Sequence, residues 1–200
     1  MKVLKKTFLA AALIVALAGV AQAKEPWELN AKESRVALGP VTAQLAKTPD
    51  NVEALKTSGI LLQQIARSDA KREDVEQAER NLKRAKELAP ADQEIAAWLG
   101  SVTTMKALFE TDPGRQTLWV KVGTKLMDAA VQGAPNNLVV RLVRANNSVE
   151  LPPFLRRARF GVEDFAYYLD ACARQTCSPT QVEEAKQKLK QAQQLVAQAQ

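Results

Sequence analysis

The residues best suited to chemistry in this 200-residue chain lie between Leu138 and Phe165, where the sequence reads LVVRLVRANNSVELPPFLRRARFGVEDF. Arg141 and Arg144 stand three apart, so a helix would carry both on one face. Counted from Pro135, they occupy positions that hold apolar or small residues after two earlier prolines, which indicates helix-packing positions. A guanidinium at such a position must pair with an acid or open onto a pocket, because an unpaired buried charge is too costly.

These arginines allow two interpretations. The first is an anion-binding site, because guanidinium groups suit carboxylates and phosphates; its members would be Arg141 and Arg144, with Arg156, Arg157 and Arg159 as further donors and Asn146 and Asn147 as neutral donors. The second is a structural network that braces the last helices against Leu151-Pro152-Pro153-Phe154, with Glu150, Glu163 and Asp164 as the acids. Acids are about as numerous as arginines, which favours the network. We expect Arg141 and Arg144 to be at least half buried and one of them to contact one of these acids.

Cys172 and Cys177 are the only cysteines, and they stand five residues apart. On a continuous helix their sulfurs would lie about 140° apart, so a bridge between them requires the helix to end near Ala173. The polar run Arg174-Gln175-Thr176 permits that end. We expect a structural disulfide, since the pair lacks the Cys-x-x-Cys spacing of redox sites. Two separate buried thiols are the alternative.

The chain contains no histidine, which removes the most common general base and the usual zinc and haem ligands. Two cysteines are too few for a Cys₄ metal site or an iron–sulfur cluster. No glycine-rich phosphate loop is present, and no carboxylate pair stands out from the charged helix faces. We therefore expect a protein that is not an enzyme and that has no cofactor and no metal site.

The first 23 residues have the composition of an export signal. Lys2, Lys5 and Lys6 precede an uncharged apolar run from Phe8 to Val20, and Ala21-Gln22-Ala23 supplies a cleavage pattern. Thirteen apolar residues span about 20 Å, short of the ~30 Å hydrocarbon core of a bilayer, so a membrane anchor is disfavoured. We expect a signal peptide over residues 1–23, cleavage after Ala23, and a periplasmic mature chain of one domain, residues 24–200, that does not span the membrane.

The charge of the mature chain excludes one class of partner. Without the three lysines of the signal, 25 basic and 22 acidic residues remain. This small surplus does not provide the concentrated basic face of a nucleic-acid-binding protein. We expect no nucleic-acid partner, and the oligomeric state stays open.

The elements that must position these residues are helices joined by proline turns. In the segment from Val75 to Gly100, Val75, Ala78, Leu82 and Ala85 follow helical spacing, Pro90 ends the helix, and a second helix follows at once. Pro49, Pro90 and Pro135 mark three equivalent turns, 41 and 45 residues apart. A small residue follows each turn at a constant offset, where two helices would cross closely: Gly59, Gly100 and Ala145.

This layout resembles a tetratricopeptide (TPR) repeat array over residues 40 to 165. A standard TPR unit has 34 residues, so each unit here would carry an insertion of about 7 to 11 residues, and longer helical-pair repeats are the alternative. The Arg-rich helix followed by Leu-Pro-Pro-Phe is similar to a group of secreted TPR proteins, which implies a fold and no particular activity. The resemblance implies an all-α solenoid of about three helix pairs with a capping helix at each end.

The two end helices are predicted from their own patterns. Residues 27–46 read as a lead-in helix that Gly39-Pro40 kinks or splits. Residues 180–200 read as a closing helix with a Thr180–Glu183 capping box and an apolar stripe on one face. The stripe could also dimerise as a coiled coil, but under three heptads is short, so capping is favoured. Trp98 and Trp119 fall within apolar patterns and are expected in the core, whereas the place of Trp27 stays open.

The concave face of such an array is the expected binding surface. Its first unit would offer Lys56, Gln63 and Gln64, and its second Ser101 and Thr104. TPR proteins that clamp a peptide carboxylate use Lys and Asn on these faces, a pattern from which this chain departs. We expect a non-enzymatic interaction module that binds a protein or peptide partner of the cell envelope in this groove, as part of an envelope assembly or a transport system. The alternative is a periplasmic protein that binds a small molecule or anion in a pocket near Arg141 and Arg144.

Overall fold

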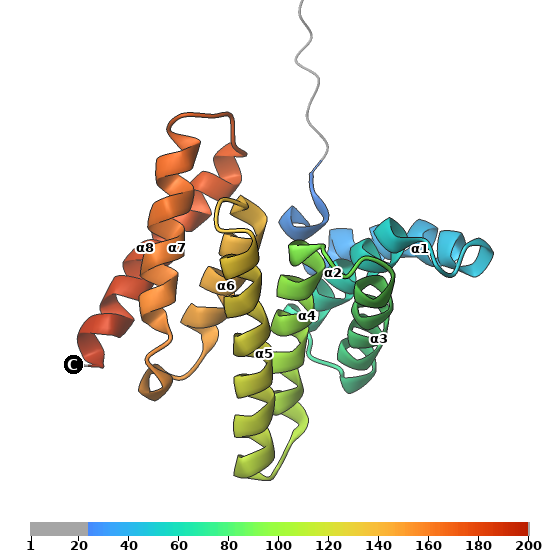
Figure 1. The fold of residues 1–200 in the computed structure, drawn as a ribbon, viewed down its shortest axis with the longest axis horizontal. Coiled ribbons are helices and arrows are strands. Elements are labelled where there is room, and N and C mark those ends of the chain that lie inside the picture. The colour runs from blue at the N-terminus through green and yellow to red at the C-terminus, as the bar shows by residue number, and fades with distance from the viewer. Residues whose placement is uncertain (1–23, 200) are drawn as a thin grey trace, which may run out of the picture.

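A computed structural model describes residues 24–199, and every regular element in that range is a helix (Figure 1). The predicted signal peptide lies outside the described residues. Eight α-helices are present in the described range, with three short 3₁₀ turns: η1 (Pro26–Glu28), α1 (Ala31–Lys47), α2 (Val52–Ser68), α3 (Arg72–Leu88), α4 (Gln93–Met105), η2 (Lys106–Phe109), α5 (Pro113–Gly133), α6 (Leu138–Glu150), η3 (Pro153–Leu155), α7 (Ala158–Cys172) and α8 (Pro179–Gln198). The all-α prediction is confirmed for this range.

The three proline turns start helices in the same way. α2, α4 and α6 each begin after an Asn or Asp N-cap, whose side-chain oxygen accepts a hydrogen bond from the backbone N–H three residues later. The oxygen–nitrogen distances are 2.9 Å for Asn51 to Ala54, 3.1 Å for Asp92 to Ile95 and 3.0 Å for Asn137 to Val140. The repeated turn therefore has a repeated physical basis, a proline that ends one helix and an Asx cap that begins the next.

Small residues allow the helices to cross closely where the spacing predicts it. A Cβ on Gly59 of α2 would overlap Leu82 of α3, and a Cβ on Gly100 of α4 would stand 2.7 Å from the carbonyl oxygen of Gly123 in α5. Ala145 of α6 is fully buried, and its own carbonyl oxygen would lie 3.6 Å from a Cβ on Gly161 of α7. Close packing thus defines the pairs α2/α3, α4/α5 and α6/α7.

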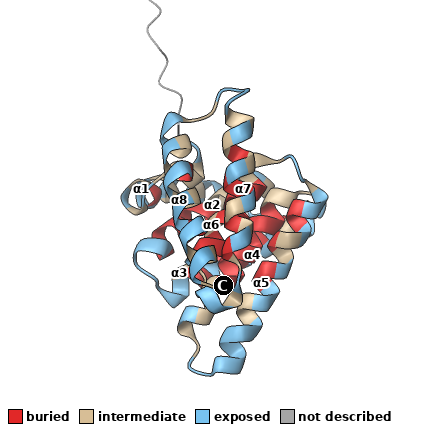
Figure 2. Cartoon of the chain, turned by 90° about the vertical axis from the view of Figure 1, so that its left-hand side faces the viewer, coloured by how far each residue is buried: buried red, intermediate tan, exposed pale blue. Residues whose placement is uncertain are grey.

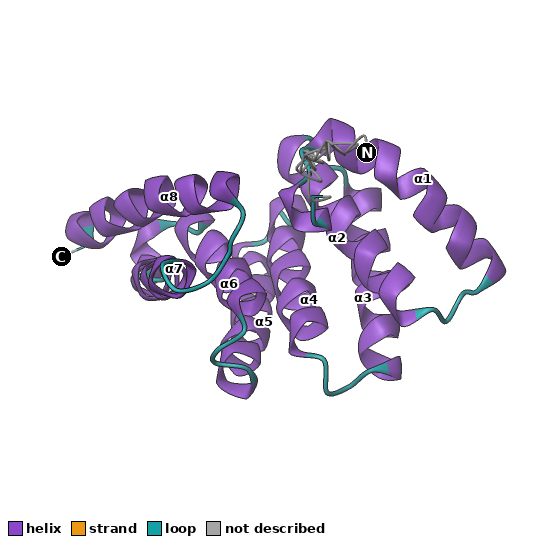
Figure 3. Cartoon of the chain, turned by 90° about the horizontal axis from the view of Figure 1, so that it is seen from above, coloured by secondary structure: helices purple, strands orange, loops and turns teal. Residues whose placement is uncertain are grey.

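The helices follow one another in chain order along an arc, from α1 at one end to α8 at the other (Figure 3). Besides packing on its partner, α4 packs on α2 and on α6, and α6 packs on α8. The even-numbered helices therefore form a continuous layer, and α3, α5 and α7 cover its other side.

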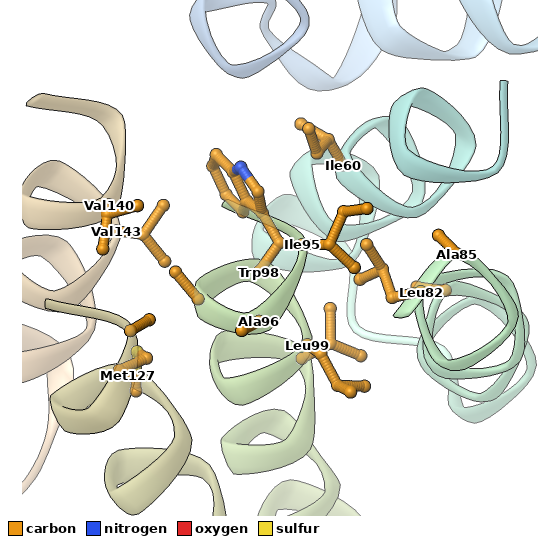
Figure 4. Packing of buried hydrophobic residues seen from close by; sticks show 14 of the residues in the cluster. Ile60, Leu82, Ala85, Ile95, Ala96, Trp98, Leu99, Met127, Val140 and Val143 are labelled. Carbon is orange, nitrogen blue, oxygen red and sulfur yellow. The ribbon is translucent and has the colours of Figure 1, made fainter. Parts of the chain in front are cut away.

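The buried residues form two apolar clusters that meet at α6, and Figure 2 shows the buried residues in the interior of the helix stack. The first cluster joins α2 to α6; in Figure 4, α4 stands at its centre, with Ile95, Trp98 and Leu99 between Leu82 on one side and Val143 on the other. The second cluster joins α6, α7 and α8: Leu142, Ala145, Val149, Phe165, Tyr168, Ala185 and Ala192. α6 thus contributes one face to each of the two clusters.

α8 and the disulfide close the C-terminal end as predicted. Ala185 and Ala192 of α8 are buried against α6 and α7, so its apolar stripe caps the stack. Cys172 ends α7 and is bonded to Cys177, with their Cα atoms 5.5 Å apart, inside the range that a disulfide requires. The bridge holds the turn between α7 and α8.

Several local predictions were wrong. α1 begins at Ala31, four residues later than predicted, and it runs through Pro40 without a split; Gly39 before the proline has no Cβ to clash with its ring. α8 is capped by Ser178, whose hydroxyl accepts from the Gln181 N–H, and Thr180 lies inside the helix. Trp98 is buried as expected, but Trp119 is only partly buried and donates its indole N–H to Glu110.

Candidate functional site

The arginine cluster is an ion-pair network between α6 and α7. Asp164 of α7 is fully buried and accepts hydrogen bonds from both helix-6 arginines. The Arg141 Nη1 atom lies 2.6 Å from Asp164 Oδ1, and Arg144 binds both carboxylate oxygens, with Nε 2.7 Å from Oδ2 and Nη2 2.9 Å from Oδ1. Glu163 lies at 3.4 Å from Arg141 and 3.2 Å from Arg144. The expectation that both arginines are at least half buried, and that one of them contacts one of the expected acids, is confirmed.

The network extends to α5 through Asp128. Arg157 binds its two carboxylate oxygens at 2.8 and 2.7 Å, and Arg144 reaches the same carboxylate at 3.5 Å. Aromatic rings cover the guanidinium groups, with the Arg141 carbon 3.9 Å from the Tyr167 ring centroid and the Arg157 carbon 4.1 Å from that of Phe160. Three arginines thus face three carboxylates.

Burial and pairing act in opposite directions on this network. Burial raises the pKa of Asp164 above the usual range of an aspartate, while the guanidinium groups of Arg144 and Arg141 act to lower it. Burial also opposes the charge on Arg144, but Asp164, Glu163 and Asp128 outweigh it and raise the pKa of that arginine. Arg144 already donates to carboxylates of the chain, and Arg141 donates to Asp164 and to the backbone carbonyl of Pro135, so the geometry favours the structural interpretation over an anion site.

The remaining members of the predicted cluster are not brought together. Asn147 is buried and donates to the Thr104 hydroxyl, and Asn146 accepts from Lys188 of α8. Glu150, expected beside the arginines of α6, binds Arg67 of α2 instead. Arg156 belongs to the turn after η3, away from the network.

The predicted groove residues are on the inner layer, but four of them are buried. Gln63 donates to the Ser101 hydroxyl at 2.6 Å, Gln64 donates to the backbone carbonyl of Trp27, and the Thr104 hydroxyl donates to the Ser101 carbonyl. The expectation of an open groove surface at these four side chains is therefore corrected. They close the contacts between helices, and Gln64 also contacts η1 at Trp27. Lys56 is partly exposed and pairs with Glu53, Asp92 and Glu94.

An inner pocket remains between α2, α4, α6 and Trp27. Its volume is about 30 Å³, the share of one water molecule. Three buried polar atoms of residues that line it have no hydrogen-bond partner: Gln63 Oε1, Asn147 Oδ1 and the Trp98 indole nitrogen. A buried polar atom without a partner costs about 1–3 kcal/mol, so the pocket favours an occupant that offers donors and an acceptor.

A larger outer hollow adjoins this pocket. It has a volume of about 770 Å³ and lies between the N-terminal segment, α6 and the disulfide-bonded turn. The two spaces share four residues, Trp27, Val139, Leu142 and Gln181. Its other walls include Tyr168 of α7 and the residues from Thr176 to Thr180. We refer to the hollow and the adjoining pocket together as the inner cleft.

Two parts of these sites escaped the sequence reasoning. Asp128 is the only acid in α5, among Arg115, Lys121 and Lys125, and that isolation was a signal for an ion pair across helices. The covering role of Trp27 had a weaker signal, the Asn30–Glu33 capping box that separates η1 from α1. A polar residue within each apolar inner helix, such as Gln63 or Asn147, could have indicated the pocket.

Three further findings concern metal sites, membrane-spanning helices and similar proteins. Within residues 24–199, no group of three or more His, Cys, Asp and Glu side chains is placed to hold a metal ion. No helix of that range has the length and apolar character needed to cross a bilayer. No family model, no curated protein and no solved structure matches this chain.

Proposed function

We propose that this protein is a non-enzymatic, TPR-like solenoid of the periplasm that binds a peptide segment of an envelope partner in the inner cleft. The three close helix pairs, the repeated proline–Asx turns and the sequential packing support the solenoid. Stacked helix pairs expose one extended inner surface, which is how helical repeats bind partners. Here that surface carries the cleft between η1, α6 and the disulfide-bonded turn.

The observation that carries the proposal is the hollow of about 770 Å³ between the N-terminal segment, α6 and the disulfide-bonded turn. Its walls combine apolar residues with charged and polar ones, including Lys24, Glu28 and Gln181, a mixture that suits the mixed surface of a peptide. A peptide backbone offers one N–H donor and one C=O acceptor at each residue. In the hollow it can therefore pair with polar side chains such as Thr180 and Gln181, whereas the inner pocket has room for one water-sized group.

The periplasmic location rests on two observations. The first is the lysine-rich and apolar composition of residues 1–23. The second is the Cys172–Cys177 bridge, which fits an oxidising compartment. The alternative function, an anion-binding pocket at Arg141 and Arg144, gains no comparable support, because those guanidinium groups are engaged by Asp164 and Glu163.

The test uses peptides selected against the protein from a random library. Thr180→Trp places a large ring on an exposed wall of the hollow, where it blocks the space without touching a core position. We expect it to weaken the affinity of the selected peptides at least about tenfold, or 1.4 kcal/mol, measured by calorimetry. Gln175→Trp is the matched control, since Gln175 is exposed near the same turn and does not line the hollow.

Two results would contradict the proposal. Selected peptides that bind Thr180→Trp as tightly as the original chain would place the binding surface elsewhere. A selection that yields no peptide would exclude short peptides as ligands.

A further inference from the structure

The turn between α6 and α7 has an unusual backbone. Pro152 and Pro153 open η3, and Arg156 follows with φ of 53°, the only non-glycine residue in the left-handed region among the described residues. Hydrogen bonds from Leu155 N–H to Pro152 and from Arg156 N–H to Pro153 hold the turn. A bulky residue in this region is strained, and such residues concentrate at functional positions.

The turn also carries arginines without acidic partners. Between Leu151 and Val162 the chain has three arginines and no acid. Asp128 binds Arg157, but Arg156 and Arg159 are exposed and form no ion pair within the described range. Glu163, one turn along from Arg159, contacts Arg141 and Arg144 instead. Arg156 and Arg159 thus stand three residues apart, both exposed and without a carboxylate partner in that range, and the Arg159 guanidinium lies 4.8 Å from the Phe160 ring centroid.

An apolar cleft and an exposed ring accompany these charges. The cleft has a volume of about 330 Å³ and lies between the turn and the last turns of α8. Arg156 and Arg159 line it together with five apolar residues: Pro153, Ala158, Leu195, Val196 and Ala199. Phe154, at the tip of the turn, is 80% exposed, the largest exposed fraction among the exposed large hydrophobic side chains of the described range.

We propose that this turn is a peripheral membrane-docking site for anionic phospholipid. Phe154 enters the interface between head groups and acyl chains, and Arg156 and Arg159 bind the phosphate groups. The cleft beside them receives part of an acyl chain. The site is independent of the inner cleft, because the two share no lining residue.

The aromatic ring and the two arginines each contribute a known attraction to an anionic membrane. Aromatic rings favour the bilayer interface, and guanidinium groups suit phosphate. An arginine near an anionic bilayer surface contributes about a fivefold change in binding. One aromatic residue and two arginines give weak, reversible docking, as expected for a protein that visits a membrane surface and carries no anchor in its described residues.

The experiment measures co-sedimentation of the exported protein, recovered from the periplasm of an expressing bacterium, with vesicles. Mixed phosphatidylcholine–phosphatidylglycerol vesicles should bind it, and pure phosphatidylcholine vesicles should bind it much less. Arg156→Gly combined with Arg159→Gln should weaken binding about 30-fold. Because glycine relieves the left-handed strain, the melting temperature of Arg156→Gly should stay equal or rise, which separates lost docking from lost folding.

The control removes the same charge from the opposite end of the arc. Lys32→Gln with Lys47→Gln changes two exposed lysines of α1 and should leave binding within about twofold, since only screened long-range attraction is lost. Phe154→Ser should weaken binding without changing the charge.

Three results would overturn the proposal. The first is equal binding to both kinds of vesicle, and the second is unchanged binding by the double arginine variant. The third is full retention by Phe154→Ser together with competition by soluble glycerol phosphate, which would make the turn a site for free anions.

Discussion

At the residue scale, the α6–α7 network shows why two arginines can occupy core positions. Asp164 is fully buried, and three charge-assisted bonds within 2.9 Å compensate for the loss of its hydration. Glu163 and Asp128 accept from the terminal nitrogens of Arg144. Such a network fixes one geometry for the helix pair, because any other register would leave a buried charge unpaired.

The first stability prediction follows from this network. Arg144→Ala leaves Asp164 buried with Arg141 as its remaining partner, so we expect unfolding to cost about 3 kcal/mol less than in the original chain. Urea denaturation measures the change. Arg174→Ala is the matched control, since the Arg174–Asp170 pair is exposed and should contribute less than about 1 kcal/mol. Similar losses in both variants would show that the buried network has no special weight.

Arg141, Arg144 and Asp164 were predictable for a physical reason. Two charges at helix-packing positions allow only a few outcomes, and Asp164 was among the three acids expected. Asp128 was missed because its isolation among the basic residues of α5 indicates an ion pair but does not identify Arg157, far along the chain, as the partner. The predicted exposure of the groove residues was wrong for a similar reason. A polar side chain on an inner helix face is predicted to face solvent when its partner, such as Trp27 for Gln64, is far along the chain.

At the element scale, the glycines at the crossings set the distance between paired helices. In α4/α5, Gly100 faces the backbone of Gly123 directly, so an added Cβ meets a carbonyl oxygen that cannot turn aside. The sequence predicted this position from its constant offset after Pro90. It could not predict the partner glycine, because Gly123 follows no repeated offset.

Gly100→Ala should therefore destabilise the protein despite the higher helix propensity of alanine. We expect a loss of about 1–3 kcal/mol, the usual cost of overpacking, measured by thermal and urea unfolding. Gly133→Ala is the control, because its new Cβ would meet only the mobile end of the Gln93 side chain, and it should change stability by less than about 0.5 kcal/mol. A neutral Gly100→Ala would mean that α4 and α5 separate freely.

At the scale of the whole molecule, the helices were predictable, but the packing of Trp27 in η1 against the first core was not. Proline turns, Asx caps and 3.6-residue periodicity are local signals, so they located α2 to α6 well. The division into two cores is a long-range property of α6, whose Val140 and Val143 enter the first cluster while Leu142 and Ala145 enter the second. No window of sequence shows which face meets which neighbour.

Two cores should give two levels of local stability. Reducing Cys172–Cys177 removes about 2 kcal/mol of loop-closure stabilisation from the α7–α8 end. We expect backbone amides of α7 and α8 to exchange hydrogen about 30-fold faster after reduction, while those of α3 and α4 keep their rates. Exchange followed by mass spectrometry, with and without reductant, measures this. A uniform acceleration along the chain would show a single cooperative unit instead.

A chain leaves the ribosome from its N-terminus, and under the proposed export it leaves the channel in the same order, so its parts become free to fold in sequence order. Every residue of the first core precedes Leu155, and this core can close while α7 and α8 are still in transit. Until they arrive, Leu142, Ala145 and Val149 form an uncovered stripe that a chaperone could hold. The two cysteines emerge after every helix of the first core. Their oxidation therefore fixes the α7–α8 turn in a molecule whose larger core has already folded.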